Sequence, residues 1–314
     1  METFLAEAFG ITSYGSEPPV EGKDYIVVGM EGMENTDASV SVQTVPYDHD
    51  GFSLEGYLAH HDHTDKAPGL LILPDWDGAS GPTGYEAERA ALVTKQTGMV
   101  TMAADIYGVN YTNVEDFGTR AQLATYYRSD PELFVGRIQA GIDVLRDNPM
   151  VDADHIYVAG YCFGGSGAID YAFSPDALES VKAVIPFHGG LNPLRAVRTD
   201  KVLPYVLILS GGIDDAHGNT TELEMQLDGA GATWEITRYS NTPHGFTKWG
   251  SSRYDPMADS RSWDSMMTLF TDMQQSLPNP ETIAPTSSSY KSSKKSKGSK
   301  NKKSKGKRSK KSKH

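Results

Sequence analysis

The segment HIYVAGYCFGGSGAIDYAF, residues 155–173, decides the fold that we expect for this chain. Its first five residues form a largely apolar run that predicts a strand, and residues 164–173 have the spacing of a helix. The turn between them, GYCFGG at 160–165, places Cys162 between glycines that leave room for a tight turn. Such a strand–turn–helix elbow presents its central side chain above the sheet, at a helix N-terminus whose dipole favours a thiolate.

Cys162 is therefore predicted to be a nucleophile. The other interpretation is a buried structural cysteine beside a glycine-rich turn, but the preceding strand and the glycines on both sides favour the nucleophile. Gly-x-Ser-x-Gly occurs nowhere in the chain, so no serine elbow competes. The backbone N–H of Phe163 would point to the place where an oxyanion develops during acyl transfer.

Strand and helix patterns alternate on both sides of this segment. Two alternating runs, 40–46 and 52–60, are joined by a turn containing Asp50-Gly51, which predicts a hairpin. Further strands are predicted at 70–74, 100–106, 181–187, 206–210 and 234–239, and further helices at 85–96, 131–146, 220–229 and 257–274. This order predicts an α/β fold, a mainly parallel sheet with helices on both faces and an N-terminal antiparallel hairpin. Functional loops then lie at the carboxyl ends of the strands.

A cysteine nucleophile needs a base, and the base needs an acid that orients it. Asp214 follows the predicted strand at 206–210 and suits the orienting role, with Asp215 as its rival. His244 lies between the last predicted strand and the last helix and suits the base, while His217 is a weaker candidate because it precedes that strand. His188, at the end of another strand, is interpreted as a packed turn residue that could also line the site.

Several motifs together resemble the dienelactone hydrolase family of α/β-hydrolases. They are LLILPDWDG at 70–78, ADIYG at 104–108, GYCFGG at 160–165, FHGG at 187–190, LSGGIDD at 209–215, HGF at 244–246 and YDPMADSRSW at 254–263. The resemblance implies an α/β-hydrolase fold and cleavage of small carboxylic esters or lactones. It implies Cys162 as nucleophile, Asp214 as acid and His244 as base, with the N–H of Trp76 as a second oxyanion donor beside that of Phe163.

The predicted substrate-binding residues are Asp75, Tyr107 and Lys248, and the sequence departs from the family pattern at or beside each of them. Asp75 stands where family members usually carry a glutamate that holds the resting thiol, and its reach is shorter by one methylene. The family arginine two residues after Tyr107 is absent, since Gly108 and Val109 follow. Lys248 replaces a second arginine, and an ammonium holds a carboxylate as a point charge rather than as a fork. Acyl transfer is thus expected, with dienelactone as a poor substrate.

Charge is distributed unevenly along the 314 residues. Residues 291–314 hold twelve Lys, one Arg and no acid, while the other 16 basic residues stand against all 41 acidic ones. We expect an N-terminal extension at 1–37, an α/β-hydrolase domain at 38–277, and a disordered basic Lys/Ser-rich tail at 278–314. The tail resembles silaffin-type segments in composition, and its expected partner is an anionic surface or polymer. The alternative function is a non-catalytic α/β-hydrolase-like protein that binds such a surface.

Neither the cysteine content nor the hydropathy suggests an oxidising compartment or a membrane. The single cysteine cannot form an intrachain disulfide, and no apolar run approaches the roughly 20 residues that span a bilayer. The first residues lack the features of a signal peptide. A cytoplasmic location is expected, with secretion or a nuclear location left open. No cofactor and no metal are predicted.

Overall fold

A computed structural model of the protein describes residues 40–61, 66–214 and 220–275. Its contacts divide the chain into two units, 1–272 and 273–314, and the sheet and the candidate site belong to the first. The predicted extension at 1–37 and tail at 278–314 lie outside the described residues, so those domain boundaries remain proposals. In the part of the chain described, no helix is long and apolar enough to cross a membrane.

Eight strands form one sheet in the order β1-β2-β4-β3-β5-β6-β7-β8. The strands are β1 (Val40–His49), β2 (Phe52–His61), β3 (Ala67–Leu73), β4 (Val100–Ala103), β5 (Val151–Tyr161), β6 (Val181–Phe187), β7 (Tyr205–Gly211) and β8 (Trp234–Tyr239). β2 is antiparallel to both β1 and β4, and every other neighbouring pair is parallel. The predicted mainly parallel sheet with an N-terminal antiparallel hairpin is confirmed.

The hairpin turn consists of Asp50 and Gly51, which both have positive φ, 54° and 77°. Two successive positive φ values match the right-handed twist of the flanking strands, and Asp-Gly adopts them readily. The side chain of Asp48 accepts the Gly51 N–H at 3.1 Å. Because the turn needs only two residues, β1 extends to His49, three residues beyond the strand predicted from the sequence.

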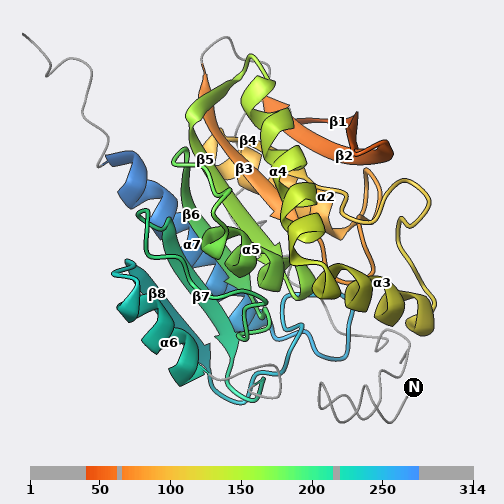
Figure 1. The fold of residues 1–314 in the computed structure, drawn as a ribbon. Coiled ribbons are helices and arrows are strands. Elements are labelled where there is room, and N and C mark those ends of the chain that lie inside the picture. Colours follow the sequence, from red (N-terminus) through yellow and green to blue (C-terminus); the bar gives the residue numbers. More distant parts are fainter. Residues whose placement is uncertain (1–39, 62–65, 215–219, 276–314) are drawn as a thin grey trace, which may run out of the picture. The chain divides into compact units, whose positions relative to one another are not determined.

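Helices lie on both faces of the sheet (Figure 1). They are α2 (Tyr85–Thr97), α3 (Phe117–Ser129), α4 (Pro131–Asp147), α5 (Phe163–Phe173), α6 (Thr220–Gly229) and α7 (Pro256–Gln275). α4 and α5 pack beside each other on the face turned toward the viewer in Figure 1. α2 and α7 meet on the opposite face, where the indole N–H of Trp263 donates to Gln96 at 2.8 Å.

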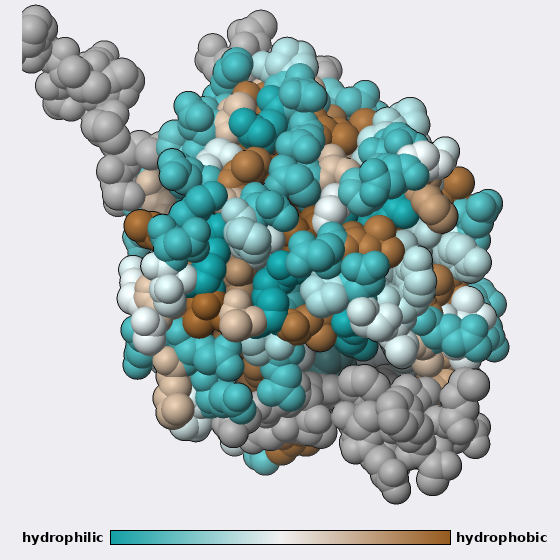
Figure 2. Space-filling model, viewed as in Figure 1, coloured by the Kyte–Doolittle hydropathy of each residue, from teal (hydrophilic) through white to brown (hydrophobic). Residues whose placement is uncertain are grey.

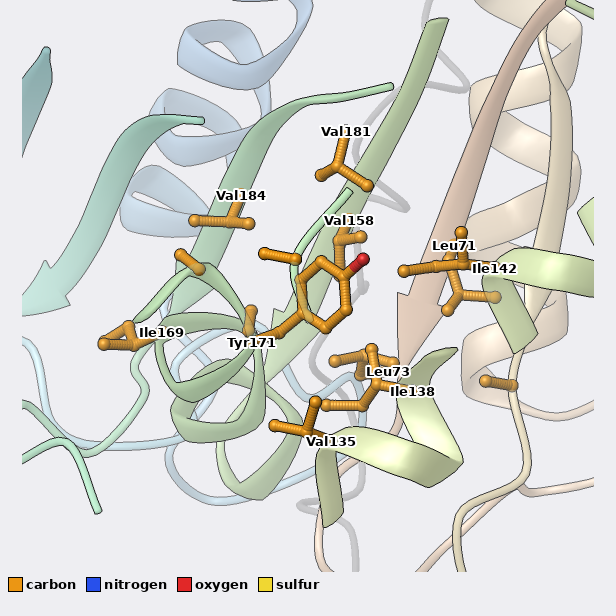
Figure 3. Close-up of a cluster of buried hydrophobic side chains, with 14 of the residues drawn as sticks. Leu71, Leu73, Val135, Ile138, Ile142, Val158, Ile169, Tyr171, Val181 and Val184 are labelled. Atoms are coloured by element: carbon orange, nitrogen blue, oxygen red, sulfur yellow. The ribbon is translucent and has the colours of Figure 1, made fainter. Parts of the chain in front are cut away.

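Buried aliphatic side chains fill the space between the sheet and α4. Figure 3 shows Leu71 and Leu73 of β3 next to Ile138 and Ile142 of α4, and all four are fully buried. Burial of each such side chain stabilises the fold by about 1.5–3 kcal/mol. The packing fixes the carboxyl end of β3, from which the segment 74–78 continues toward the candidate site. Hydrophilic residues cover most of the outer face of the molecule shown in Figure 2.

The segment after β4 differs most from the sequence-based expectation. The strand predicted to reach residue 106 ends at Ala103, because the Asp105 carboxylate accepts the N–H groups of Tyr107 at 3.0 Å and Gly108 at 2.8 Å and turns the chain. Helix α3 was not predicted. It begins at the N-cap Asp116, whose side chain accepts the Thr119 N–H at 2.7 Å.

Candidate active site

Cys162 lies at the sharp turn between β5 and α5. Its φ of 53° and ψ of −109° are unusual for a residue with a side chain, and its N–H donates to the Phe187 carbonyl at 3.0 Å. Ser166 donates back to the Cys162 carbonyl at 3.1 Å, so hydrogen bonds on both sides hold the conformation. Strained backbone of this kind concentrates at functional sites, where the surrounding structure maintains it.

The glycines of the elbow allow it to approach the end of β3. A Cβ on Gly164 would lie 2.6 Å from the carbonyl oxygens of Leu73 and Pro74, which is too close for any side chain. A Cβ on Gly160 would collide with the Gly164 carbonyl. The Gly164 N–H donates to the Pro74 oxygen at 3.0 Å, which joins the elbow to the segment after β3. The GYCFGG pattern is thus explained by close backbone contact.

The structure brings Cys162, His244 and Asp214 into one hydrogen-bonded series. Nε2 of His244 lies 2.9 Å from Sγ of Cys162, and Nδ1 lies 2.9 Å from Oδ2 and 3.0 Å from Oδ1 of Asp214. The side chain of Asp214 is 2% exposed and that of His244 11%. Asp214 directly follows the turn after β7, and His244 lies between β8 and α7. The rival residues Asp215 and His217 lie outside the described residues.

The charges of this series depend on one another. Burial raises the pKa of the Cys162 thiol and the Asp75 carboxylate raises it further, while His244 acts in the opposite direction. Burial alone would lower the pKa of His244, but interactions with Cys162 and Asp214 outweigh it and raise that pKa well above its usual value. A proton that leaves the sulfur is therefore held well on the imidazole.

Two backbone N–H groups were predicted to bind an oxyanion. The N–H of Phe163 lies at the first position of α5, where a helix has no internal acceptor. The N–H of Trp76 donates to the carboxylate of the preceding Asp75. Within the described residues no hydrogen bond joins Asp75 to the thiol of Cys162. Asp75 thus occupies the second predicted oxyanion donor in this structure, instead of holding the thiol.

Lys248, whose side chain is 26% exposed, joins a cluster of buried carboxylates. Its Nζ lies 3.1 Å from Oδ2 of Asp77 and 4.9 Å from the centroid of the Tyr85 ring. Burial alone would lower the pKa of Lys248, but Glu86, Asp75 and Asp77 together raise it. Burial, and then the neighbouring Asp75, raise the pKa of Asp77 to about 6. Negative groups outnumber the ammonium here, so Lys248 already has its counter-ions.

Aromatic residues and Arg128 lie close to Phe163 of the elbow. The ring of Tyr107 lies 5.3 Å from that of Phe163, and burial raises the pKa of Tyr107 well above its usual value. Trp76 meets Phe117 edge to face at 5.3 Å. The guanidinium of Arg128 lies 5.4 Å from the Phe163 ring, and its charge acts to lower the pKa of Cys162. Sequence reasoning missed Arg128 because helix α3 was not predicted, although the Asp116 cap was a usable signal.

On this sheet, a cysteine lies at the elbow, an acid follows a later strand and a histidine precedes the last helix. This arrangement defines an α/β-hydrolase. The sequence profile described as "Dienelactone hydrolase family" matches residues 54–274. The chain therefore belongs to the dienelactone hydrolase family, and it is a hydrolase of that family.

The individual proteins that resemble this chain share only a small fraction of its residues. A protein of Bradyrhizobium sp named "Probable 2-oxo-3-(5-oxofuran-2-ylidene)propanoate lactonase" is 21% identical over 242 residues, 73% of this chain and 93% of its own length. The dienelactone hydrolase-like promiscuous phosphotriesterase P91, from metagenomic libraries, is 25% identical, with a TM-score of 0.67 over 74% of this chain and 98% of its own. A putative dienelactone hydrolase from Klebsiella pneumoniae is 19% identical, with a TM-score of 0.56 over 74% of this chain and 99% of its own.

Proposed function

We propose that the protein hydrolyses small, uncharged carboxylic esters or lactones, with Cys162 as nucleophile, His244 as base and Asp214 as orienting acid. The observation that carries this proposal is the continuous series from the sulfur through both imidazole nitrogens to the buried carboxylate. The family membership and the lactonase name of the Bradyrhizobium relative support the same reaction class.

The first half-reaction acylates the enzyme. The thiol proton moves to Nε2 of His244 and the sulfur attacks the acyl carbon, which forms a C–S bond and leaves negative charge on the former carbonyl oxygen. The Phe163 N–H donates to that oxygen, and the Trp76 N–H joins it once the Asp75 carboxylate turns away. When the tetrahedral intermediate collapses, the C–O bond breaks and His244 gives its proton to the leaving alkoxide.

The second half-reaction releases the acid. His244, neutral again, takes a proton from water while the water oxygen attacks the thioester carbon. The C–S bond then breaks, the carboxylic acid product leaves and the proton returns to the sulfur. Throughout both steps, Asp214 keeps Nδ1 of His244 protonated and Nε2 directed at the thiol.

Esters of p-nitrophenol provide the direct test. Purified protein is assayed with p-nitrophenyl acetate and longer acyl chains, before and after alkylation with iodoacetamide. We expect turnover that alkylation eliminates, because Cys162 is the single cysteine of the chain. Turnover that survives complete alkylation would contradict a cysteine mechanism, and an absence of turnover on all esters and lactones would favour the non-catalytic alternative.

The charge of the substrate should matter, and we expect kcat/KM on dienelactone to be at least about tenfold lower than on an uncharged lactone of similar size. The dienelactone carboxylate would approach Asp75 and Asp77, while Lys248 is already paired. Steady-state kinetics with both substrates measure the ratio. A marked preference for dienelactone would mean that a cation such as Arg128 holds its carboxylate.

We further propose that the segment 278–314 is a basic tail that binds anionic surfaces independently of catalysis. Removing residues 285–314 should leave kcat on a neutral ester within about twofold, since the proposed triad lies before Pro285, whereas binding to silica or nucleic acid should be lost. The thirteen cations at 291–314 form the large positive charge of an otherwise acidic chain. Binding is measured from 50 to 500 mM salt and should weaken steeply. An unchanged salt dependence in the truncated protein would disprove the assignment.

A further inference from the structure

The loop that carries His244 is held at Thr247, three residues further along. Thr247 is fully buried, and its Oγ1 lies 2.8 Å from the hydroxyl of Tyr85 and 2.8 Å from Nε2 of His188. Its carbonyl oxygen accepts a hydrogen bond from Nη2 of Arg89 at 2.9 Å and one from Tyr85 at 3.1 Å. Thr247 is thus held both by α2 and by His188 at the end of β6.

The group that holds the Thr247 carbonyl is itself fixed in place. Nη2 of Arg89 also donates to Oδ1 and Oδ2 of Asp259 in α7, at 2.7 and 2.9 Å, and both side chains are fully buried. The indole N–H of Trp249 donates to the same carboxylate at 3.2 Å. A buried ion pair is weak evidence for net stability, because replacing such a pair with apolar residues is often neutral or stabilising. Its geometric effect is to join α2, α7 and the loop after β8 at one point.

His188 connects this network to the base. Its ring meets that of His244 edge to face, with centroids 5.1 Å apart, and it is 1% exposed. Its φ of 38° is unusual for a residue with a side chain, so the structure holds it in a strained conformation. Burial keeps the pKa of His188 well below its usual value, and the ring is therefore neutral. A neutral ring can support His244 without opposing its protonation.

We propose that Thr247 is a positioning residue for the base, and that its hydroxyl acts through His188 to keep Nε2 of His244 within hydrogen-bond distance of Cys162. This inference rests on the proposed function, since it takes His244 to be the base. Its contribution should appear in the chemical step rather than in substrate binding, because none of the three residues Thr247, Tyr85 and Arg89 belongs to the predicted substrate site. A displacement of about 1 Å in a catalytic group can reduce turnover by up to 10²-fold.

The test compares Thr247→Val with Thr247→Ser. Valine has nearly the same shape but cannot hydrogen-bond, whereas serine keeps the hydroxyl. For Thr247→Val we expect kcat on p-nitrophenyl acetate to fall about tenfold or more with KM within about twofold, and for Thr247→Ser we expect kcat within about threefold of the wild type. Thr94→Val is the matched control: Thr94 is equally buried in α2, and its hydroxyl donates to the Ala59 carbonyl, away from His244.

Alkylation gives a second measurement that needs no turnover. The rate at which iodoacetamide modifies Cys162 at pH 7 reports the thiolate that His244 stabilises, and no other cysteine interferes. We expect this rate to fall about fivefold or more in Thr247→Val and to be unchanged in Thr94→Val. If the wild type hydrolyses no ester, the proposed function fails, while the alkylation rates still decide the positioning role.

His188→Asn supplies an independent variant should Thr247→Val not fold. Asparagine tolerates positive φ but removes the ring that contacts His244. We expect kcat and the alkylation rate to fall together in this variant, again with little change in KM. Normal kcat and alkylation rates in either folded variant, with only a lowered melting temperature, would overturn the proposal and reduce the network to a structural role.

Discussion

Replacing Cys162 with alanine should reduce ester hydrolysis by about 10³-fold or more and leave the fold intact. The sulfur forms the bond to the acyl carbon, so no other group of the proposed series can substitute for it. The side chain is small, only partly buried and located at the edge of the core, so its loss removes few packing contacts. Turnover of p-nitrophenyl acetate and the far-UV circular dichroism spectrum provide the two measurements.

Cys162→Ser is the companion variant. It keeps the shape of the elbow but replaces the thiol by a hydroxyl of far higher pKa, which His244 deprotonates less readily. We expect only a trace of activity, no more than about 1% of the wild type, with a melting temperature within about 3 °C. Full turnover in Cys162→Ala, after contaminating esterases are ruled out with a mock purification, would refute the proposed mechanism.

Replacing Asp214 with asparagine should lower kcat by about 10²- to 10⁴-fold. The carboxylate accepts from Nδ1 of His244 and raises the pKa of that histidine. An amide can present its NH₂ group to the same nitrogen and so favour the wrong tautomer, in which Nε2 carries the proton and cannot accept one from sulfur. The lower pKa of His244 also makes the thiolate–imidazolium pair harder to form.

Asp215→Asn is the matched control, since Asp215 is the rival acid in sequence but lies outside the described residues. We expect its kcat to remain within about threefold of the wild type, because Asp214 already supplies the carboxylate that contacts Nδ1 of His244. Equal losses in the two variants, or a larger one in Asp215→Asn, would mean that the wrong aspartate has been assigned as the acid. Both proteins should be compared at the same pH and salt concentration.

The fold could be predicted from the sequence because its patterns are local. The Asp-Gly step encodes a two-residue hairpin turn, and continuous apolar runs encode strands that are buried on both faces. Helix α3 escaped prediction for a local reason too. Only Ala121, Ala124 and Tyr127 of its thirteen residues are buried, so the helical period of apolar residues is faint. Because α3 was not predicted, Arg128, the cation beside the elbow, was not predicted as part of the site either.

The sequence by itself determined the elbow, since a cysteine between a strand and a helix with glycines on both sides permits few other conformations. It also placed Asp214 and His244 after strands whose carboxyl ends share one edge of the sheet. Only the tertiary structure decided which partners the other groups have. Lys248 pairs with Asp77, and Thr247 meets Arg89, across separations of 171 and 158 residues. Local pattern sets secondary structure and turns, whereas such contacts depend on how helices on both faces pack against the sheet.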